Sequence, residues 1–450
     1  MTSPNHQIDL EELASLAKRR GFVFQSSEIY GGLASTWDYG PLGIELKRKI
    51  KELWWNQFVI KQENIFGLDS SIIMHPKVWD VSGHTSNFAD PLVECKKCNH
   101  RYRSDQMTES TCSNCGGELG ESRLFNLMFK TFLGPIEDNT NATYLRPETA
   151  QGIFVNFLNV KNTINRNPPF GIAQTGKSFR NEITTGNFIF RTREFEMMEM
   201  EFFVPPDEDE KWHEYWINQS FDWYLNLGLS KNRLRIREHD QTELAHYSKA
   251  THDIEYLFPW GWGEIAGIAN RTNYDLTAHS DQSGKDLSYF DETLKQHVIP
   301  YVIEPSFGLD RVIMALLIEA YKEESVVSSK GKEETRTSLK LSPLVAPVQV
   351  AVLPLSKKDV LSELAREIYK SLKFSELIKP LVYYDETQSI GRRYRRQDEI
   401  GTPLCVTVDF ESLDDKAVTI RERDSMNQTR IPINDLENEI GARLSDKAQD

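Results

Sequence analysis

The stretch GKSFRNEITTGNFIFRTREFEMMEMEFF, residues 176–203, decides the fold class of this chain. Alternating apolar, β-branched and aromatic residues in GIAQTGKSF, NFIFRTREF and MEMEFFV predict short strands. Strands that follow one another this closely, joined by short loops, are typical of an antiparallel sheet. The sequence therefore predicts an antiparallel sheet within the first three quarters of the chain.

Charged residues within this stretch indicate phosphate chemistry. Arg180 and Glu182 are two residues apart, so a strand would place both on one side of the sheet. Arg191 and Arg193 follow on the next strand. Arginine offers a planar fork that can hold two oxygens of one phosphate. The alternative is a ladder of cross-strand salt bridges on an exposed sheet.

A second stretch, IEPSFGLDRVIMALL, residues 303–317, predicts a buried strand that runs through Gly308 into an apolar helix. Asp310 and Arg311 then stand at the start of that helix, where unpaired backbone N–H groups favour anions. The alternative is that Asp310 merely caps the helix and Arg311 is exposed. This short string does not decide between the two.

Farther out, helices are expected at residues 9–20, with Asp9 as N-cap, at residues 42–58 and at residues 207–227, because apolar residues recur three to four apart. The polar segment 325–342 is interpreted as a linker. Beyond it, strands and a helix alternate, as in a small α/β domain. We therefore expect a larger domain at residues 1–340 and a smaller one at residues 346–450.

Four of the five cysteines form two C-x-x-C pairs inside residues 91–143, which we interpret as an inserted module. Cys95, Cys98, Cys112 and Cys115 can supply four thiolates to one tetrahedral zinc ion, with no position left for a substrate. A redox pair is the alternative, although no thioredoxin-like pattern surrounds it. Cys405, in a predicted strand, is expected to be a buried thiol.

Composition narrows the class of protein. The chain has 450 residues, 27% charged residues and a net charge of -14, so any nucleic-acid surface must be local. Arg392, Arg393, Arg395 and Arg396 form a basic island that is a candidate RNA contact; a solvated helix face is the alternative. The sequence has no long apolar run and no secretory signal, so no membrane partner and a reducing, cytoplasmic location are expected.

The two stretches resemble motifs 2 and 3 of class II aminoacyl-tRNA synthetases, and the segment around Pro41 resembles motif 1, which builds their homodimer. The strings SSEIYGGLASTWDYGPLG, HTSNFADPLVEC, LRPETAQGIFVNF and SIGRRYRRQDEIGTPLCVTVD are similar to those of the dimeric glycyl-tRNA synthetase family. The resemblance implies an α+β catalytic domain with the antiparallel class II synthetase sheet, an inserted zinc-knuckle module and a C-terminal α/β anticodon-binding domain.

The resemblance also implies the reaction: glycine is activated with ATP and Mg²⁺, then transferred to tRNA(Gly). The catalytic residues implied are Arg180, Arg311 and Glu264, with Glu264 helping to hold Mg²⁺. Phe195 is expected to stack under the adenine, with Arg311 over it. The ATP-binding residues implied are Arg180, Asn181, Glu182, Phe190, Arg191, Thr192, Arg193, Glu194, Phe195, Glu264, Ile265, Gly308, Leu309, Asp310 and Arg311.

The same resemblance implies an acidic pocket for the glycine ammonium and an anticodon contact through the four arginines of the basic island. The glycine-binding residues implied are Arg103, Glu148, Phe195, Glu196, Glu199, Arg271, Glu304 and Ser306. Two alternatives remain: a histidine, threonine or proline synthetase, and a non-catalytic accessory subunit. The first is disfavoured by the acidic pocket, and the second by the complete set of ATP-site residues.

Overall fold

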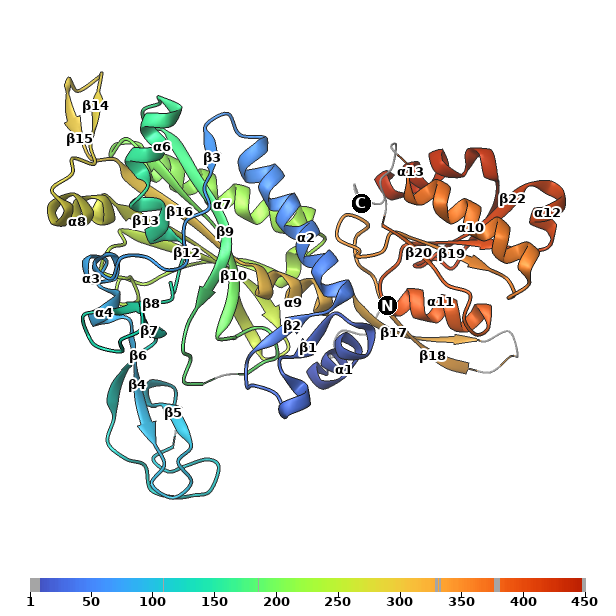
Figure 1. Cartoon of the computed structure of the whole chain (residues 1–450), viewed down its shortest axis with the longest axis horizontal. Coiled ribbons are helices and arrows are strands. Elements are labelled where there is room, and N and C mark those ends of the chain that lie inside the picture. The colour runs from blue at the N-terminus through green and yellow to red at the C-terminus, as the bar shows by residue number, and fades with distance from the viewer. Residues whose placement is uncertain are drawn as a thin grey trace.

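The computed structural model describes residues 9–446, except 108, 185, 328–330, 332 and 376–380. A larger N-terminal lobe and a smaller C-terminal lobe are joined by a β-hairpin (Figure 1). Among the described residues, each helix is too short or too polar to span a lipid bilayer.

The core of the N-terminal lobe is one sheet, in the order β11-β12-β13-β16-β10-β9-β3. Every neighbouring pair is antiparallel except β3 with β9, which confirms the predicted antiparallel sheet. The strands are β3 (Ile65–Gly67), β9 (Phe170–Phe179), β10 (Glu194–Val204), β11 (Leu234–Glu238), β12 (Ala250–Phe258), β13 (Gly261–Thr272) and β16 (Tyr301–Gly308).

The loop between β9 and β10 differs from the prediction, which extended strands through residues 180–182 and 187–193. Arg180 and Glu182 lie in this loop, and Asn187 and Phe188 have positive φ angles of 57° and 58°, which a strand excludes. The aromatic residues that imitate a strand pack inward instead: Ile189 is buried, and the Phe188 ring meets Trp37 edge to face.

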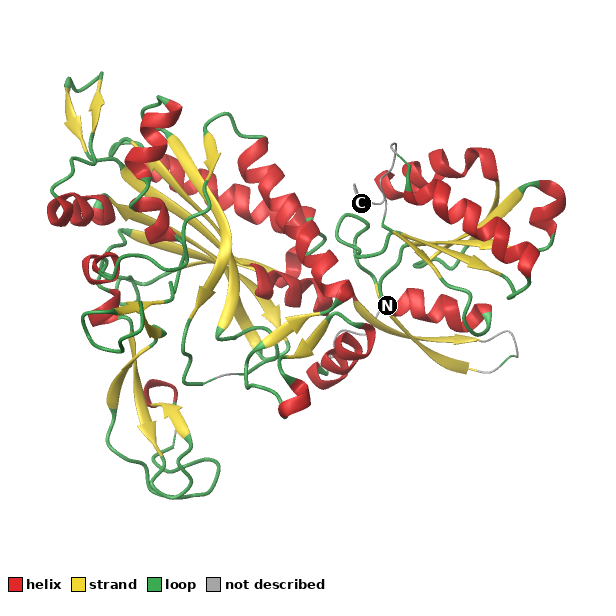
Figure 2. Ribbon diagram, viewed as in Figure 1, coloured by secondary structure: helices red, strands yellow, loops and turns green. Residues whose placement is uncertain are grey.

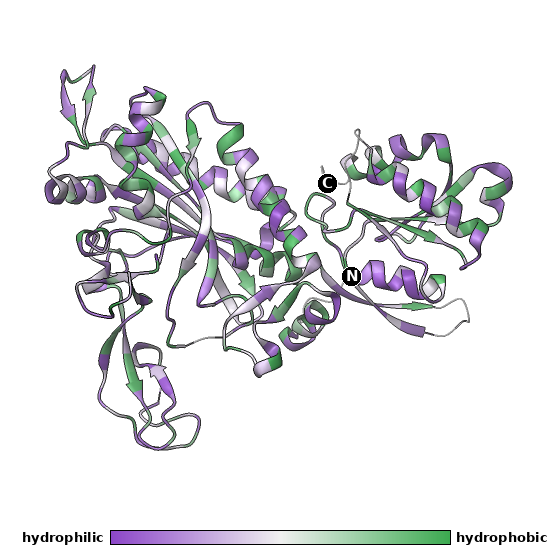
Figure 3. Ribbon diagram, viewed as in Figure 1, coloured by the Kyte–Doolittle hydropathy of each residue, from purple (hydrophilic) through white to green (hydrophobic). Residues whose placement is uncertain are grey.

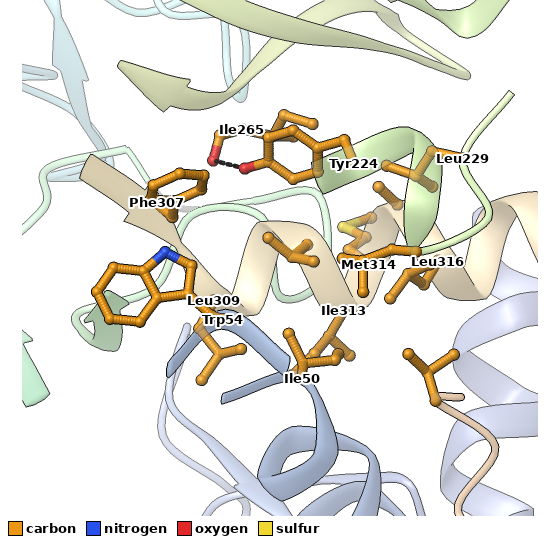
Figure 4. Close-up of a cluster of buried hydrophobic side chains, with 14 of the residues drawn as sticks. Ile50, Trp54, Tyr224, Leu229, Ile265, Phe307, Leu309, Ile313, Met314 and Leu316 are labelled. Carbon is orange, nitrogen blue, oxygen red and sulfur yellow. Dashed lines mark hydrogen bonds between the residues drawn. The ribbon is translucent and has the colours of Figure 1, made fainter. Parts of the chain in front are cut away.

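Helices cover the face of the sheet opposite the cavity described below (Figure 2). Met198, Met200 and Phe202 of β10 alternate onto this face and join the largest apolar core. Figure 4 shows part of it, where Trp54 meets Phe307, Ile50 lies beside Ile313, and the Tyr224 hydroxyl donates to the carbonyl of Ile265 at 3.0 Å. The helices on this face are α2 (Pro41–Trp55), α7 (Asp209–Asn226) and α9 (Leu309–Ala320), and α1 (Leu10–Arg20) joins the same apolar core through Leu13 and Leu16.

Two of these helices begin and pack as the sequence predicts. The side chain of Asp9 accepts a hydrogen bond from Glu11 N at 2.9 Å, and Gly21 ends α1 in the left-handed conformation. In Figure 3, α2 and α10 alternate between hydrophilic and hydrophobic colouring along their length, as helices with one buried face do.

Shorter elements surround this core. The inserted module projects away from the lobe as the sheet β5-β4-β6 with the cysteine knuckles at its tip (Figure 1). The elements are β1 (Val23–Gln25), β2 (Trp37–Tyr39), α3 (Lys77–Val81), α4 (His84–Asn87), β4 (Ala89–Glu94), β5 (Arg101–Arg103), β6 (Arg123–Asn126), β7 (Lys130–Phe132), β8 (Ala142–Tyr144), α5 (Ala150–Phe154), α6 (Phe157–Ile164), α8 (Tyr274–Ser283), β14 (Tyr289–Asp291) and β15 (Gln296–Val298).

The expected linker at residues 325–342 is wrong for most of its length. Strands β17 (Tyr321–Val327) and β18 (Glu333–Leu339) form an antiparallel hairpin that packs along α11. Polar residues of the hairpin form ion pairs across its strands and between the lobes. Arg336, for example, is buried and pairs with Glu324 and with Asp398 of the C-terminal lobe. Polar composition alone could not distinguish this hairpin from a coil.

The C-terminal lobe is the expected α/β domain, with sheet order β20-β19-β21-β22-β23. Cys405 lies buried in this sheet, as predicted. Glu399 forms salt bridges with Arg19 and Arg20 of α1, so the two lobes also meet away from the hairpin. The elements are β19 (Val350–Pro354), α10 (Asp359–Lys373), β20 (Val382–Tyr384), α11 (Ile390–Glu399), β21 (Leu404–Val408), α12 (Glu411–Asp415), β22 (Ala417–Glu422), β23 (Gln428–Pro432) and α13 (Leu436–Asp446).

Candidate active site

A cavity of about 320 Å³ lies on the face of the central sheet opposite the apolar core. This size is in the range of small-molecule sites. The central sheet forms one wall of the cavity. Because side chains alternate along a strand, those of β10, β13 and β16 that do not face the core face the cavity. Predicted site residues that line it are Glu148, Arg180, Glu182, Phe190, Arg191, Thr192, Phe195, Glu196, Glu199, Glu264, Glu304, Ser306, Gly308, Asp310 and Arg311.

Arg180 is held in place by contacts that do not neutralise its charge. Its Nε donates to the carbonyl oxygen of Pro147 at 3.1 Å, and its guanidinium lies 5.3 Å from the centre of the Phe195 ring. Within the described residues, no acidic oxygen lies within salt-bridge distance of Arg180. Its terminal nitrogens can therefore still bind an anion.

Arg311 is held on the other side of the cavity. It donates to the Glu264 carbonyl at 2.9 Å and to the Glu264 carboxylate at 3.1 Å. Its guanidinium lies over Phe190 at 4.5 Å, whereas the sequence-based expectation placed Arg311 opposite Phe195. Gly263 makes room for this ring, since a Cβ there would lie 3.0 Å from Phe190.

Three glutamates converge at the inner end of the cavity. Glu199 accepts hydrogen bonds from Thr149 N at 3.0 Å and from the hydroxyl of Ser306 at 2.8 Å. Burial would raise the pKa of Glu148, but His84, Arg271 and Arg180 together hold it well below its usual value. The site therefore keeps negative charge at neutral pH.

The pKa of Glu304 is shifted in the opposite direction, above its usual value. Burial and the nearby charges of Glu199 and Glu148 raise its pKa to about 8, against the opposing effect of Arg271. Arg271 donates to Glu304 at 2.7 Å and to Asp275 at 2.8 Å, so it orients Glu304 from behind the cavity.

Glu196 is among the residues at the cavity, but its side chain points to the other side of β10 and away from the predicted glycine contacts. Its carboxylate pairs with Lys47 at 3.0 Å and Lys51 at 2.6 Å, both on α2, rather than facing the three glutamates. Asp310 accepts from Glu196 N at 2.8 Å and from the Tyr39 hydroxyl. This buried cluster joins the motif 1 helix to the segments that carry Phe195 and Arg311.

Other predicted site residues do not line the cavity. Arg103, in the inserted module, pairs with Asp90 at 2.8 Å and Asp105 at 2.7 Å. Ile265 and Leu309 are buried in the core. The remaining three contribute backbone or surface contacts: Asn181 N donates to Leu127 O, Arg193 donates to Ala34 O, and Glu194 pairs with Lys177.

Sequence reasoning missed several residues of the site. Tyr247, Asp253 and His239 line the cavity from loops and from β12, where no local pattern marks them. Thr149 adjoins Glu148 in the RPETAQG string and could have been identified there.

The cysteine cluster has the geometry that zinc requires. The Sγ atoms of Cys95 and Cys115, and those of Cys98 and Cys112, lie 3.6 Å apart. Tetrahedral Zn–S bonds of about 2.3 Å imply S···S distances of roughly 3.8 Å. The backbone N–H of Lys97 points at Cys95 Sγ from 3.4 Å, as outer partners of a metal thiolate do.

The basic island on α11 is not a uniform cationic surface. Arg393 is buried and donates to backbone carbonyls, among them those of Gln388 and Leu355 at 3.2 and 3.3 Å. Arg396 pairs with Asp385 and Arg395 with Glu334, while Arg392 is exposed. The prediction that all four arginines are available for contact is wrong for Arg393, because its helix position faces the sheet.

Comparison with known proteins gives consistent results. The family "tRNA synthetase class II core domain (G, H, P, S and T)" matches residues 129–321, and "Anticodon binding domain" matches residues 349–443. Proteins named glycine–tRNA ligase are similar along nearly the whole chain. That of Bifidobacterium longum is 53% identical, covering 98% of this chain and 94% of the relative. That of Treponema denticola is 52% identical over 98% of each chain.

Solved structures agree on the fold. A prolyl-tRNA synthetase from Cryptosporidium parvum, complexed with halofuginone and AMPPNP, superposes with a TM-score of 0.68 at 16% identity, covering 97% of this chain and 77% of the other. At this identity, the likeness concerns the fold alone.

Proposed function

The chain belongs to the glycine–tRNA ligase family, and from this premise we propose how its cavity carries out the reaction. The enzyme activates glycine with ATP and transfers it to tRNA(Gly). In the first step the glycine carboxylate attacks the α-phosphate in line, which gives glycyl-adenylate and pyrophosphate. In the second, a hydroxyl of the 3′-terminal ribose attacks the carbonyl carbon of glycyl-adenylate, which forms the glycyl ester and releases AMP. The observation that carries the proposal is that three glutamates converge in one cavity with Arg311 and with Arg180, which has no carboxylate partner in the described part of the chain.

Glycine binds, in this proposal, at the inner end of the cavity. Its ammonium meets Glu148, Glu199 and Glu304, and Ser306 fixes Glu199 from the side. A missing methyl group is worth only about 1–3 kcal/mol in binding, so attraction alone cannot discriminate glycine from alanine. Rejection of alanine must come from steric conflict in this enclosed acidic end.

The arginines act on ATP. Arg180 is placed to hold the α-phosphate and to stabilise the negative charge that develops there, because its terminal nitrogens are free. Arg311 and the rings of Phe190 and Phe195 hold the adenine, and Glu182 and Arg191 line the same cavity. No side-chain nucleophile is needed, since positioning and electrostatics account for catalysis of phosphoryl and adenylyl transfer.

Mg²⁺ is the ion expected with ATP, and the side chains at this end fit it. A Cβ built on Gly267 would lie 3.7 Å from both Glu264 Oε1 and Asp253 Oδ1, so both carboxylates flank the same position on β13. Magnesium prefers such oxygen ligands. When bound, it would neutralise phosphate charge; Glu264 and Asp253 are the residues that would hold it.

The remaining parts support this chemistry. We assign residues 1–340 to catalysis, with residues 91–143 as an inserted module whose four cysteines hold structural zinc, and residues 346–450 to anticodon binding. The family matches, to residues 129–321 and 349–443, support the separation of a catalytic domain from an anticodon-binding domain. Arg392 and Arg395, on the exposed side of α11, are the arginines of the basic island that we assign to RNA.

We also propose that the enzyme is a homodimer that acts in the cytoplasm, where translation uses its product. Ile29 and Tyr30, beside the motif 1 segment, are 88% and 87% exposed, and Leu33 and Ile44 are exposed nearby. Several strongly exposed apolar side chains so close in the sequence support an interface at this segment.

The test of the proposed site is single-turnover formation of glycyl-adenylate. Arg180→Ala should reduce it by about a hundred- to a thousandfold, the size of effect seen when one charge-stabilising group is removed. The control is Arg166→Ala, because Arg166 also lies over a phenylalanine ring, that of Phe66, but outside the cavity. A burst of adenylate near the wild-type level in a folded Arg180→Ala protein would contradict the assignment.

A further inference from the structure

The inserted module joins the N-terminal lobe through a neck, which we define as Phe88 and Leu127. Phe88 comes directly before β4, and Leu127 directly after β6. Leu127 N donates to Phe88 O at 3.0 Å and so closes the neck. Leu127 O in turn accepts from Asn181 N at 2.7 Å, so the neck is bonded to the residue that follows Arg180.

The ring of Phe88 reaches Arg180 itself. The Arg180 guanidinium lies 5.3 Å from the centre of the Phe88 ring and 5.3 Å from that of Phe195. Two aromatic rings that contact one guanidinium fix it through its cationic group without using its N–H donors. A carboxylate would hold Arg180 as firmly but would occupy those donors and neutralise the charge that a phosphate needs.

The short helix before the neck contacts the glycine end of the cavity. His84 Nε2 lies 3.3 Å from Glu148 Oε2, and His84 Nδ1 lies 2.8 Å from Ser82 Oγ. The His84 ring packs against Trp79 and Phe88, with ring centres 5.4 Å apart in each case. Asn126, on the last strand of the module, donates to the carbonyl oxygens of His84 and Thr85 at 3.0 and 3.1 Å.

We propose that Phe88 and His84 are positioning residues, through which the neck of the inserted module aims Arg180 at the α-phosphate and Glu148 at the glycine ammonium. This inference rests on the proposed roles of Arg180 and Glu148. It gives the module a function in amino-acid activation, independent of tRNA. Packing alone would not require the two side chains to contact the phosphate arginine and the ammonium glutamate separately.

The two residues make different kinetic predictions. Phe88→Leu keeps an apolar side chain but removes the ring, so Arg180 loses orientation mainly in the transition state. The kcat of glycine-dependent ATP–pyrophosphate exchange should fall about five- to thirtyfold, the rate equivalent of one partly buried cation–π contact. KM for glycine should stay within about twofold. Phe88→Tyr restores the ring and should restore kcat to within about threefold.

The control for Phe88 is Phe66→Leu. Phe66 is partly buried in the same lobe and faces Arg166 at 6.0 Å, so the substitution removes a similar contact away from the cavity. It should leave both constants unchanged. The proposal is overturned if Phe88→Leu keeps kcat within twofold of wild type, or if Phe88→Tyr loses as much as Phe88→Leu while both remain folded by thermal unfolding.

His84→Ala frees the Glu148 carboxylate to move, so KM for glycine should rise about tenfold while kcat changes by less than about threefold. His84→Gln can still donate an N–H to Glu148 and should recover most of this loss. The control is His297→Ala, because His297 has the same kind of serine contact, with Ser288 at 3.0 Å, on the β14–β15 hairpin. An unchanged glycine KM in His84→Ala, or a Gln variant as poor as the Ala variant, overturns the role of His84.

Parallel measurement of Arg180→Ala and Glu148→Gln separates the two levels of inference. If these variants keep normal exchange, the proposed site itself is wrong. If they lose exchange and the Phe88 and His84 variants do not, the site stands and the positioning role of the neck fails.

Discussion

Arg393→Ala is expected to destabilise the C-terminal lobe, although the sequence places Arg393 in a basic island. The side chain is 1% exposed and donates to the carbonyl oxygens of Pro354, Leu355, Asp385 and Gln388. A hydrogen bond from a charged donor contributes about 1.5–3 kcal/mol, and a buried carbonyl left unpaired adds a penalty of about 1–3 kcal/mol. Because these contributions are not additive, we expect a loss of about 3–5 kcal/mol.

Such a loss is a large part of the stability of a domain of this size. With a urea dependence of about 2 kcal/mol per M, the unfolding midpoint of the C-terminal lobe should fall by roughly 2 M. Hydrogen exchange of peptides from β19 and β21, measured in the full-length enzyme over a urea series, resolves this lobe from the rest.

The matched control is Arg392→Ala, one residue earlier on the exposed side of α11. It should change the free energy of unfolding by less than about 0.5 kcal/mol. It should instead raise the tRNA KM and flatten the salt dependence of tRNA binding, since one phosphate contact is lost. Equal stability of the Arg393→Ala and Arg392→Ala proteins would refute the structural role of Arg393.

Three further predictions follow from the rest of the molecule. The pKa of Glu304 is raised to about 8, so the folded protein keeps a proton there that the unfolded chain loses near pH 4.5. The contribution of Glu304 to the free energy of unfolding therefore falls as the pH rises from 4.5 to 8. Glycine binding should therefore release about one proton at pH 7 and fewer at pH 8.5, as calorimetry in buffers of different ionisation enthalpy would measure, and no release at pH 7 would contradict the ammonium contact. Elemental analysis should find about one zinc per chain, reduced in Cys112→Ser; native protein without metal and with freely titrating thiols would exclude the zinc site. Tyr30→Asp should shift the enzyme from dimer to monomer in sedimentation velocity, whereas the exposed Phe374→Asp in the C-terminal lobe should not; a wild-type monomer would remove the interface.

Much of the fold could be predicted because its signals are local. The helix capped by Asp9 is marked by that cap and by its apolar period, β9 by alternation, and β16 by the apolar residues of a buried strand. The β17–β18 hairpin could not be predicted, because its polar residues find charged partners such as Asp398 only after the two lobes come together. The loop before β10 is predicted as a strand because its aromatic and apolar residues resemble strand residues, although they pack into the core from a loop.

The candidate site shows the same division. Residues within continuous motifs, such as Arg180, Glu199 and Arg311, could be identified from sequence, and the structure brings them to one cavity. The direction of a side chain could not be predicted from these motifs. Glu196 faces Lys47, and Arg393 faces buried carbonyl oxygens. Partners that lie far apart in sequence, such as His84 for Glu148, leave no local pattern at all.

The central claim is that this cavity activates glycine and rejects side chains larger than hydrogen. Its most direct test is ATP–pyrophosphate exchange with each of the twenty amino acids in turn, without tRNA. The account predicts exchange with glycine and, for alanine and serine, rates lower by at least about a thousandfold, because a steric conflict in an enclosed pocket costs more than a missing contact. Exchange supported by another amino acid at a rate comparable to that of glycine, or no exchange with glycine in a folded enzyme, would contradict it.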